Sequence, residues 1–318
     1  MLSPAPLFSR VVLAYMDLSG IYHPYCDSAY AEALDDFGVP IEVAPWGSWI
    51  LRQSIGDSGF VDAMGLYPLL AFASNTDIGA GRAILEAAGL VSFVGVADPF
   101  AAPPVSNLAR EFDVCSPFKQ HMIIDRRLGA FDFSRHHRYE IRRAHRSCRV
   151  ERLPLRDHLD RWIELYDELI AHQNIKGIQC FSRRYFERIA EMPTLGCFAA
   201  RQDGAIVAMT LWFRGDRIAY FHLGASSAAG YRTSASYALV AAAIEQYADC
   251  EIVNLGGGPG LTDDNNGLVQ FKRGFANSSA CSHLCGMILD RAGYTKLAGD
   301  AGNGQYFPVY RGPGKQCG

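Results

Sequence analysis

The sequence has no long hydrophobic run. Its most apolar stretch, residues 235–244, is interrupted by Ser236 and followed by Glu245. A membrane-spanning helix needs about 20 consecutive apolar residues, so we expect no membrane partner. The N-terminal segment has early prolines and no basic residue before Arg10, which is unlike a secretory signal. We therefore expect a cytoplasmic protein.

The sequence also lacks a disulfide framework and a strong charge of one sign. Its nine cysteines are an odd number and are scattered along the chain, so we expect reduced thiols. The formal net charge is −3, which excludes a protein that binds nucleic acid through its overall charge. Any contact with nucleic acid must come from a local basic patch.

Several catalytic signatures are missing. No Gly-x-Ser-x-Gly, His-Glu-x-x-His or Walker sequence occurs, so serine hydrolases, zincins and P-loop enzymes have no support. Gly256-Gly257-Gly258 does not have the spacing of a dinucleotide-binding loop. Cys281, His283 and Cys285 would share one strand face without a nearby fourth ligand, so we predict no metal.

A local basic patch is present at residues 135–152, where seven arginines face two glutamates. Five of the arginines recur at steps of three and four, and Ile141, Ala144 and Cys148 follow the same steps on another face. This pattern predicts an amphipathic helix with a cationic stripe. Such a stripe is either a solvated face or a phosphate-binding face, and we favour phosphate binding. The candidate residues are Arg138, Arg142, Arg143 and Arg146.

The order of predicted elements indicates a mixed α/β protein. In the second half, helices at 156–172 and 182–191 precede strands at 195–201, 205–214 and 217–225, a helix at 231–247, and strands at 251–255 and 282–289. In the first half we predict strands at 10–15, 41–44, 49–54, 66–72, 91–96 and 119–124, and helices at 28–37 and 77–88. A last strand is predicted at 306–310, and the domain boundary between residues 134 and 135.

One short motif carries a candidate catalytic group. Phe271-Lys272-Arg273-Gly274-Phe275 places a lysine between two aromatic residues, after the glycine-rich loop. The lysine is either a side chain that extends from the core to solvent beside two buried phenylalanines, or a cation held at a reacting group. An ammonium in such a place can stabilise the negative charge that develops when an amine attacks an ester.

This motif, the segment Arg138-Tyr139-Glu140-Ile141-Arg142-Arg143-Ala144 and the element order together resemble the FemABX-like branch of the GNAT-fold transferases. The resemblance implies an α/β fold of two tandem GNAT-like domains, with mixed, mostly antiparallel sheets flanked by helices. The domains would be residues 1–134 and 135–318, with the final strand packing back on the first domain. It also implies transfer of an aminoacyl group from aminoacyl-tRNA to an amine, without a cofactor.

The resemblance assigns roles to individual residues. Lys272 would stabilise the oxyanion or hold the terminal adenosine of the tRNA. Phe271, Phe275 and Asn254, together with the arginines of the basic helix, would contact the substrate or the tRNA. Tyr67 lies in Gly65-Leu66-Tyr67-Pro68-Leu69, which loosely resembles the turn that lines the acceptor groove in the family. A tyrosine of the core is the alternative there.

The sequence departs from acyl-CoA-dependent GNAT enzymes at residues 225–233, which lack the spaced glycines of a pyrophosphate loop. No long helical arm is present, which resembles the compact members, such as those of pacidamycin-type peptidyl-nucleoside pathways. We expect a small peptide, a peptidyl-nucleoside or other nucleotide-linked amine, or a peptidoglycan precursor as acceptor, and no stable protein partner. An acyl-CoA-dependent N-acyltransferase and a non-catalytic RNA-binding module remain alternatives, and no general base is identified.

Overall fold

The structure, a computed structural model, describes residues 22–175, 177–258, 267–299 and 306–312. In this part of the chain, 11 strands form one sheet in the order β1-β2-β3-β4-β11-β5-β10-β9-β8-β7-β6. The strands are β1 (Val39–Val43), β2 (Ser48–Ser54), β3 (Val61–Gly65), β4 (Leu90–Ala97), β5 (Val114–Asp125), β6 (Arg149–Arg152), β7 (Leu195–Gln202), β8 (Ala205–Arg214), β9 (Ile218–Ser226), β10 (Ile252–Asn254) and β11 (Ser278–Ile288). The helices are α1 (Ser28–Ala33), α2 (Ile78–Ala87), α3 (Val105–Glu111), α4 (Arg135–Ala144), α5 (Leu159–Gln173), α6 (Arg183–Ala190), α7 (Ala228–Arg232), α8 (Ala235–Gln246), α9 (Gly267–Arg273) and α10 (Arg291–Ala298). The mixed, mostly antiparallel α/β class predicted from the sequence is confirmed.

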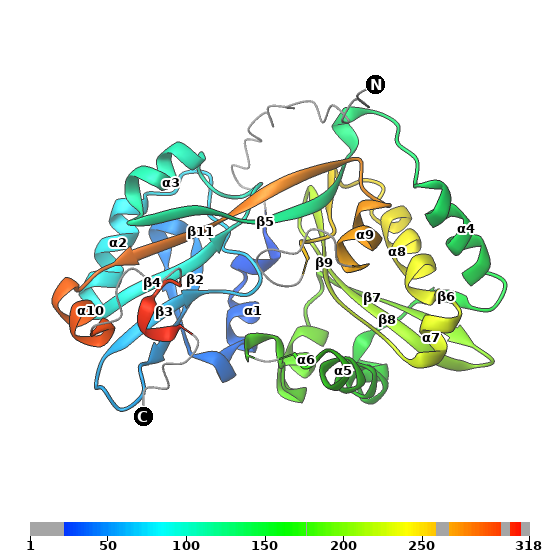
Figure 1. Cartoon of the computed structure of the whole chain (residues 1–318), viewed down its shortest axis with the longest axis horizontal. Helices are drawn as coiled ribbons and strands as arrows, with labels where there is room; N and C mark the ends of the chain where they lie inside the picture. Colours follow the sequence, from blue (N-terminus) through cyan, green and yellow to red (C-terminus); the bar gives the residue numbers. More distant parts are fainter. Residues whose placement is uncertain (1–21, 176, 259–266, 300–305, 313–318) are drawn as a thin grey trace, which may run out of the picture.

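The two ends of the sheet repeat one pattern. In the first half β1, β2 and β3 are antiparallel, α2 follows, and β4 lies parallel to β3. In the second half β7, β8 and β9 are antiparallel, α7 and α8 follow, and β10 lies parallel to β9. Each half is then continued by a long strand from the other part of the sequence: β11 pairs with β4, and β5 pairs with β10. Figure 1 shows β11 and β5 running side by side through the middle of the molecule.

The predicted domains therefore share a single sheet. The division at residues 134 and 135 stays a prediction, because the sheet continues across it. Helices cover both faces of the second half, with α5 on β8 and β9 and α8 on β7 and β8. One hydrophobic cluster joins Tyr30 and Leu51 of the first half to Trp162 and Phe213 of the second half. None of the helices in the described residues is both long and apolar enough to cross a membrane.

Turn chemistry explains the meander of the second half. Asp203 and Gly204 have φ values of 50° and 83°, which is the left-handed pair that a tight hairpin requires. The predicted hairpin between β7 and β8 is confirmed. Ser234 has a φ of 58° and separates α7 from α8, so the single helix predicted at 231–247 is two helices.

Some predicted elements are wrong. Residues 66–72 form no strand, and β3 ends at Gly65; Pro68 has no N–H to donate to a ladder. Residues 306–310 form no strand either, and the segment instead contains a short 3-10 helix, Val309–Arg311, after Pro308. The basic helix ends at Ala144, Arg146 lies in the turn that follows, and Arg149 begins β6, so neither of these two arginines is on the helical stripe. The strand predicted at 10–15 lies outside the described residues.

Candidate functional site

The site lies where β9 and β10 separate. The two strands pair in parallel over three residues, and the last pair joins Asn254 to Tyr220. Beyond this pair β9 continues to Ser226, whereas β10 ends and the chain enters Gly256 and Gly257. The parallel ladder therefore opens at Asn254, and the glycine-rich segment begins at the opening.

Lys272 reaches this opening from α9. Its side chain is buried, with 8% of the residue exposed, and Nζ donates a hydrogen bond of 2.7 Å to the carbonyl oxygen of Gly257. Nζ also lies 5.6 Å from the centre of the Phe221 ring on β9. Burial, and then the nearby charge of Lys119, lower the pKa of Lys272 to about 7. A buried amine close to its titration point at neutral pH is typical of a functional position.

The aromatic residues of the motif belong to the surrounding core. Phe275 is fully buried and packs edge-on against His137, with 4.5 Å between ring centres. Phe271 is partly buried and packs against the same cluster. A Cβ added at Gly274 would lie 1.9 Å from the ring of His137, so only glycine fits between the two phenylalanines. Phe275 therefore belongs to the hydrophobic core, and Phe271 lies at the edge of the same cluster.

His137 holds the motif in place, and sequence reasoning missed it. Its Nε2 atom donates a hydrogen bond of 2.7 Å to the carbonyl oxygen of Phe271, and Nδ1 lies 2.8 Å from the hydroxyl oxygen of Ser134. The last carbonyl groups of a helix have no partner within the helix, so this bond satisfies one carbonyl of α9. A signal was present, because residue 137 precedes Ile141 and Ala144 on the apolar face of the basic helix.

The candidate arginines of α4 and of the turn after it differ in whether other groups already bind them. Arg138 forms an ion pair with Asp132 and also donates a hydrogen bond of 2.7 Å to the carbonyl oxygen of Phe133. Arg143 lies 3.3 Å from the carboxylate of Glu140 and donates to the carbonyl oxygen of Arg232. The remaining two candidates are exposed and have no ion pair within the part of the chain that the structure describes: Arg142 and Arg146.

Asn254 lies at the opening, beside the backbone of Gly256, and a Cβ added at Gly256 would lie 3.2 Å from Nζ of Lys272. Its Oδ1 atom accepts a hydrogen bond of 2.8 Å from the N–H of Gly256 and one of 3.0 Å from Nδ1 of His121. Since a backbone N–H only donates, this contact fixes the orientation of the amide. Its Nδ2 group then has no hydrogen-bond partner among the described residues, although only 1% of the residue is exposed. Burial lowers the pKa of His121 to about 4, so His121 is neutral. Sequence reasoning gave no signal for His121.

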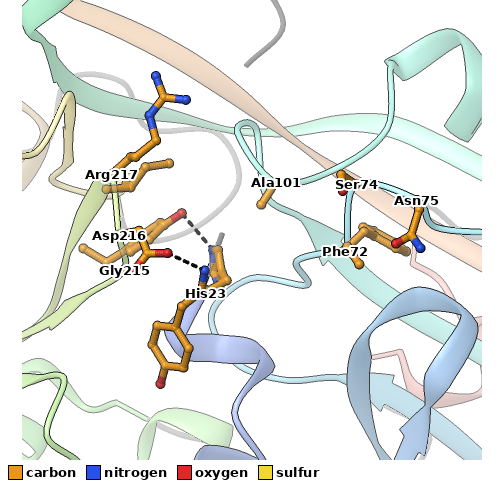
Figure 2. Close-up of a pocket in the computed structure, with 12 residues that line it drawn as sticks. His23, Phe72, Ser74, Asn75, Ala101, Gly215, Asp216 and Arg217 are labelled. Carbon is orange, nitrogen blue, oxygen red and sulfur yellow. Dashed lines mark hydrogen bonds between the residues drawn. The ribbon is translucent and has the colours of Figure 1, made fainter. Parts of the chain in front are cut away.

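A cavity of about 230 Å³ lies between the two halves, next to Tyr220. Figure 2 shows Asp216 and Arg217 on one wall, Phe72, Ser74 and Asn75 on the other, and His23 at the base. Nε2 of His23 lies 2.8 Å from the hydroxyl of Tyr220 and 3.5 Å from the buried carboxylate of Asp98. Burial opposes the charge of Asp98, but His23 and the N–H of Phe100 outweigh it and lower its pKa. Tyr220 of the lining is paired with Asn254 on the neighbouring strand, whereas the lining residues 215–218 precede this pair and lie on the side away from the opening.

Tyr67 belongs to a buried polar cluster at the junction of the halves. Its carbonyl oxygen accepts a hydrogen bond of 2.6 Å from the hydroxyl of Tyr30, and its own hydroxyl accepts one of 3.3 Å from the side-chain amide of Gln179. Its ring lies 6.2 Å from that of His222, which is hydrogen-bonded to Tyr185. Burial raises the pKa of Tyr67. The structure brings Tyr67 to the junction of the halves but not to the lining of the cavity in Figure 2.

Comparisons with known proteins agree with this architecture. A family model described as an acetyltransferase (GNAT) domain matches residues 132–273. The structure of FemX is 13% identical, with 86% of this chain and 94% of that chain covered and a TM-score of 0.65. The fold is FemABX-like, built on the GNAT pattern. No curated protein matches the sequence itself.

Two further structures share the FemABX-like fold. The C-terminal domain of a putative lysylphosphatidylglycerol synthetase from Agrobacterium fabrum is 19% identical, with coverage of 86% of this chain and 91% of that chain and a TM-score of 0.58. L-PGS from Bacillus licheniformis is 15% identical, with 84% and 93% coverage and a TM-score of 0.54. The fold and the GNAT match together support an acyltransferase. At these identities the likeness concerns the fold, so the roles of single residues depend on the geometry above.

Proposed function

We propose that this protein is an aminoacyl-tRNA-dependent aminoacyltransferase that forms a peptide bond on the amine of a small peptide, a peptidyl-nucleoside or a peptidoglycan precursor. The observation that carries the proposal is the buried Lys272, held on Gly257 at the opening between β9 and β10. When an amine attacks an aminoacyl ester, negative charge develops on the carbonyl oxygen. An ammonium fixed in a water-poor site stabilises that charge.

The likeness in fold to FemX and to lysylphosphatidylglycerol synthetases favours an aminoacyl donor. The start of α7 favours the same donor over coenzyme A. In acyl-CoA-dependent GNAT enzymes, free backbone N–H groups at this helix start would cradle a pyrophosphate. Here the hydroxyl of Ser227 already accepts from the N–H of Gly230, and a Cβ at Gly230 would lie 2.5 Å from the carbonyl oxygen of Val207.

The basic helix supplies a face for the phosphates of a tRNA. Arg142 on α4 and Arg146 in the turn after it are exposed, and His137 of α4 is bonded to the motif that carries Lys272. Phosphate contacts position a nucleic acid without reading its sequence. The exposed arginines would hold the body of the donor while its aminoacylated end enters the opening.

The cavity between the halves suits the amine of the acceptor. His23 and Tyr220 line it, and Nε2 of His23 lies 3.5 Å from the buried carboxylate of Asp98. A volume of about 230 Å³ accommodates the reactive end of an acceptor rather than a whole precursor. Its lining residue Tyr220 is paired with Asn254 at the opening, so we place the amine at this end of the cavity, toward the donor ester. Positioning two reactants in this way supplies much of the rate when the ester is already activated.

The test is product formation with a panel of charged tRNAs and candidate amines, followed by mass spectrometry. Lys272→Met should lower turnover by a factor of about one hundred or more, while Lys296→Met on α10 serves as a matched control at another site. Near-normal turnover of Lys272→Met at saturating charged tRNA would contradict the role of Lys272. An acyl-CoA-dependent N-acyltransferase is the second candidate, favoured by the match to a GNAT acetyltransferase domain.

A further inference from the structure

A second lysine flanks the glycine that holds Lys272. Lys119 lies on β5, and a Cβ added at Gly257 would lie 3.1 Å from its Cβ and 3.4 Å from its Cδ. On the other side, the carbonyl oxygen of Gly257 accepts the hydrogen bond from Lys272. The backbone of Gly257 thus lies between two lysine side chains that come from different elements of the sheet and its covering helices.

These two cations have no counter-charge in the part of the chain that the structure describes. The Lys119 ammonium lies 5.5 Å from the centre of the Phe118 ring, and Lys272 contacts a neutral carbonyl and the Phe221 ring. Burial lowers the pKa of Lys119, and Lys119 in turn contributes to lowering that of Lys272. Burying cations side by side is unfavourable unless an anion joins them.

A neutral hydrogen-bond donor, the side-chain amide of Asn254, lies beside Gly256. The Nδ2 group of Asn254 is buried and has no hydrogen-bond partner in the parts of the chain that the structure describes, while its Oδ1 atom accepts hydrogen bonds from Gly256 and His121. A buried N–H group without a partner costs free energy that a ligand acceptor would recover. Lys272 uses one of its three N–H bonds on Gly257, so two remain for a ligand.

We propose that Lys119, Lys272 and Asn254 form a phosphate site around Gly257, which takes the phosphodiester nearest to the aminoacylated end of the donor. This inference rests on the proposed function. The α-carboxylate of the amino acid is esterified in the donor, so the anion that every charged tRNA brings to this place is a phosphate. The remaining N–H of Lys272 stays available for the carbonyl oxygen of the ester, which places the two functions of that side chain next to each other.

The experiment compares Lys119→Gln with Lys296→Gln, which removes the same charge from α10. In Lys119→Gln the KM for charged tRNA should rise about tenfold or more, because a charge-assisted contact is lost, while the KM for the acceptor stays unchanged. The slope of log affinity for uncharged tRNA against log salt should fall by about one. The decline of kcat/KM at alkaline pH should also move to higher pH, since Lys272 loses a cationic neighbour.

Each result decides the matter. An unchanged donor KM and an unchanged salt slope in Lys119→Gln, with normal transfer by the wild type, would overturn the phosphate site and leave the proposed function intact. A rise in the KM of the acceptor alone would overturn it too. If no charged tRNA supports transfer by the wild type, but uncharged tRNA binds and Lys119→Gln lowers its salt slope by about one, the proposed function fails and the phosphate site stands.

Discussion

Replacing Lys272 with methionine should make the protein more stable at neutral pH while it lowers turnover by a factor of about one hundred or more. The side chain is buried and its pKa falls from 10.5 to about 7, first because of burial. One pKa unit corresponds to about 1.4 kcal/mol, so burying the charged form costs about 5 kcal/mol below pH 7. Methionine has a similar length and no charge, and therefore removes this cost.

The gain is smaller than the full cost. Methionine leaves the carbonyl oxygen of Gly257 without its donor, which costs about 1 kcal/mol, and the protein relaxes around the change. A net stabilisation of about 2–4 kcal/mol is expected under mildly acidic conditions. Because the folded-state pKa lies below the unfolded-state value, the folded wild type binds fewer protons than the unfolded chain between pH 7 and 10.5. The free energy of unfolding of the wild type therefore rises with pH in this window, and the advantage of Lys272→Met shrinks.

The assay is urea unfolding of the wild type, Lys272→Met and the control Lys296→Met at about pH 6 and about pH 9, in buffers without phosphate. The midpoint of Lys272→Met should exceed that of the wild type clearly at the lower pH and only slightly at the higher pH. The control should show no such pH dependence. Equal differences at both pH values, or a wild type that is the more stable protein at the lower pH, would refute the buried cation.

Three other predictions follow from particular contacts. Arg142→Gln combined with Arg146→Gln should lower the slope of log tRNA affinity against log salt by about two, because each lost phosphate contact removes about one. An unchanged slope would mean that these arginines are a solvated surface and do not bind phosphate. Calorimetric titration with acetyl-CoA should detect no binding in the micromolar range, and a Kd on the order of micromolar would favour the N-acyltransferase instead. Gly274→Ala should destabilise the protein by about 1–3 kcal/mol, seen as a lower Tm, because its Cβ would meet the ring of His137; a normal Tm would mean that α4 and α9 can move apart.

The fold was predictable where local chemistry decides the structure. The hairpin at Asp203 and Gly204 followed from a turn pair that tolerates positive φ, and the apolar periodicity located most strands of the second half. Prediction failed where a proline lies in an apolar run, as at residues 66–72, since hydrophobicity alone does not reveal the missing N–H. The exchange of β5 and β11 between the halves is a long-range pairing, which no local pattern specifies.

The candidate site was predictable only in part, for a related physical reason. The motif at Lys272 drew attention because charge between aromatic residues is unusual, and the structure shows that this lysine is buried. Lys119 and His121 lie on an ordinary-looking strand, and they join the site only because β5 is paired with β10. A site assembled across strands from distant parts of the sequence leaves no spacing that reading the chain in order would reveal.

The two motifs that stand out in the sequence act as one structural unit. His137 of the basic helix α4 satisfies a carbonyl of α9, and Gly274 lets its ring pack against the chain directly after Lys272. A ligand whose phosphates bind the exposed arginines of α4 would therefore also affect the position of α9, the helix that carries the buried ammonium. If the protein transfers aminoacyl groups as proposed, His137 is the contact through which correct seating of the tRNA body aligns Lys272 with the ester, and its loss should lower turnover even where tRNA still binds.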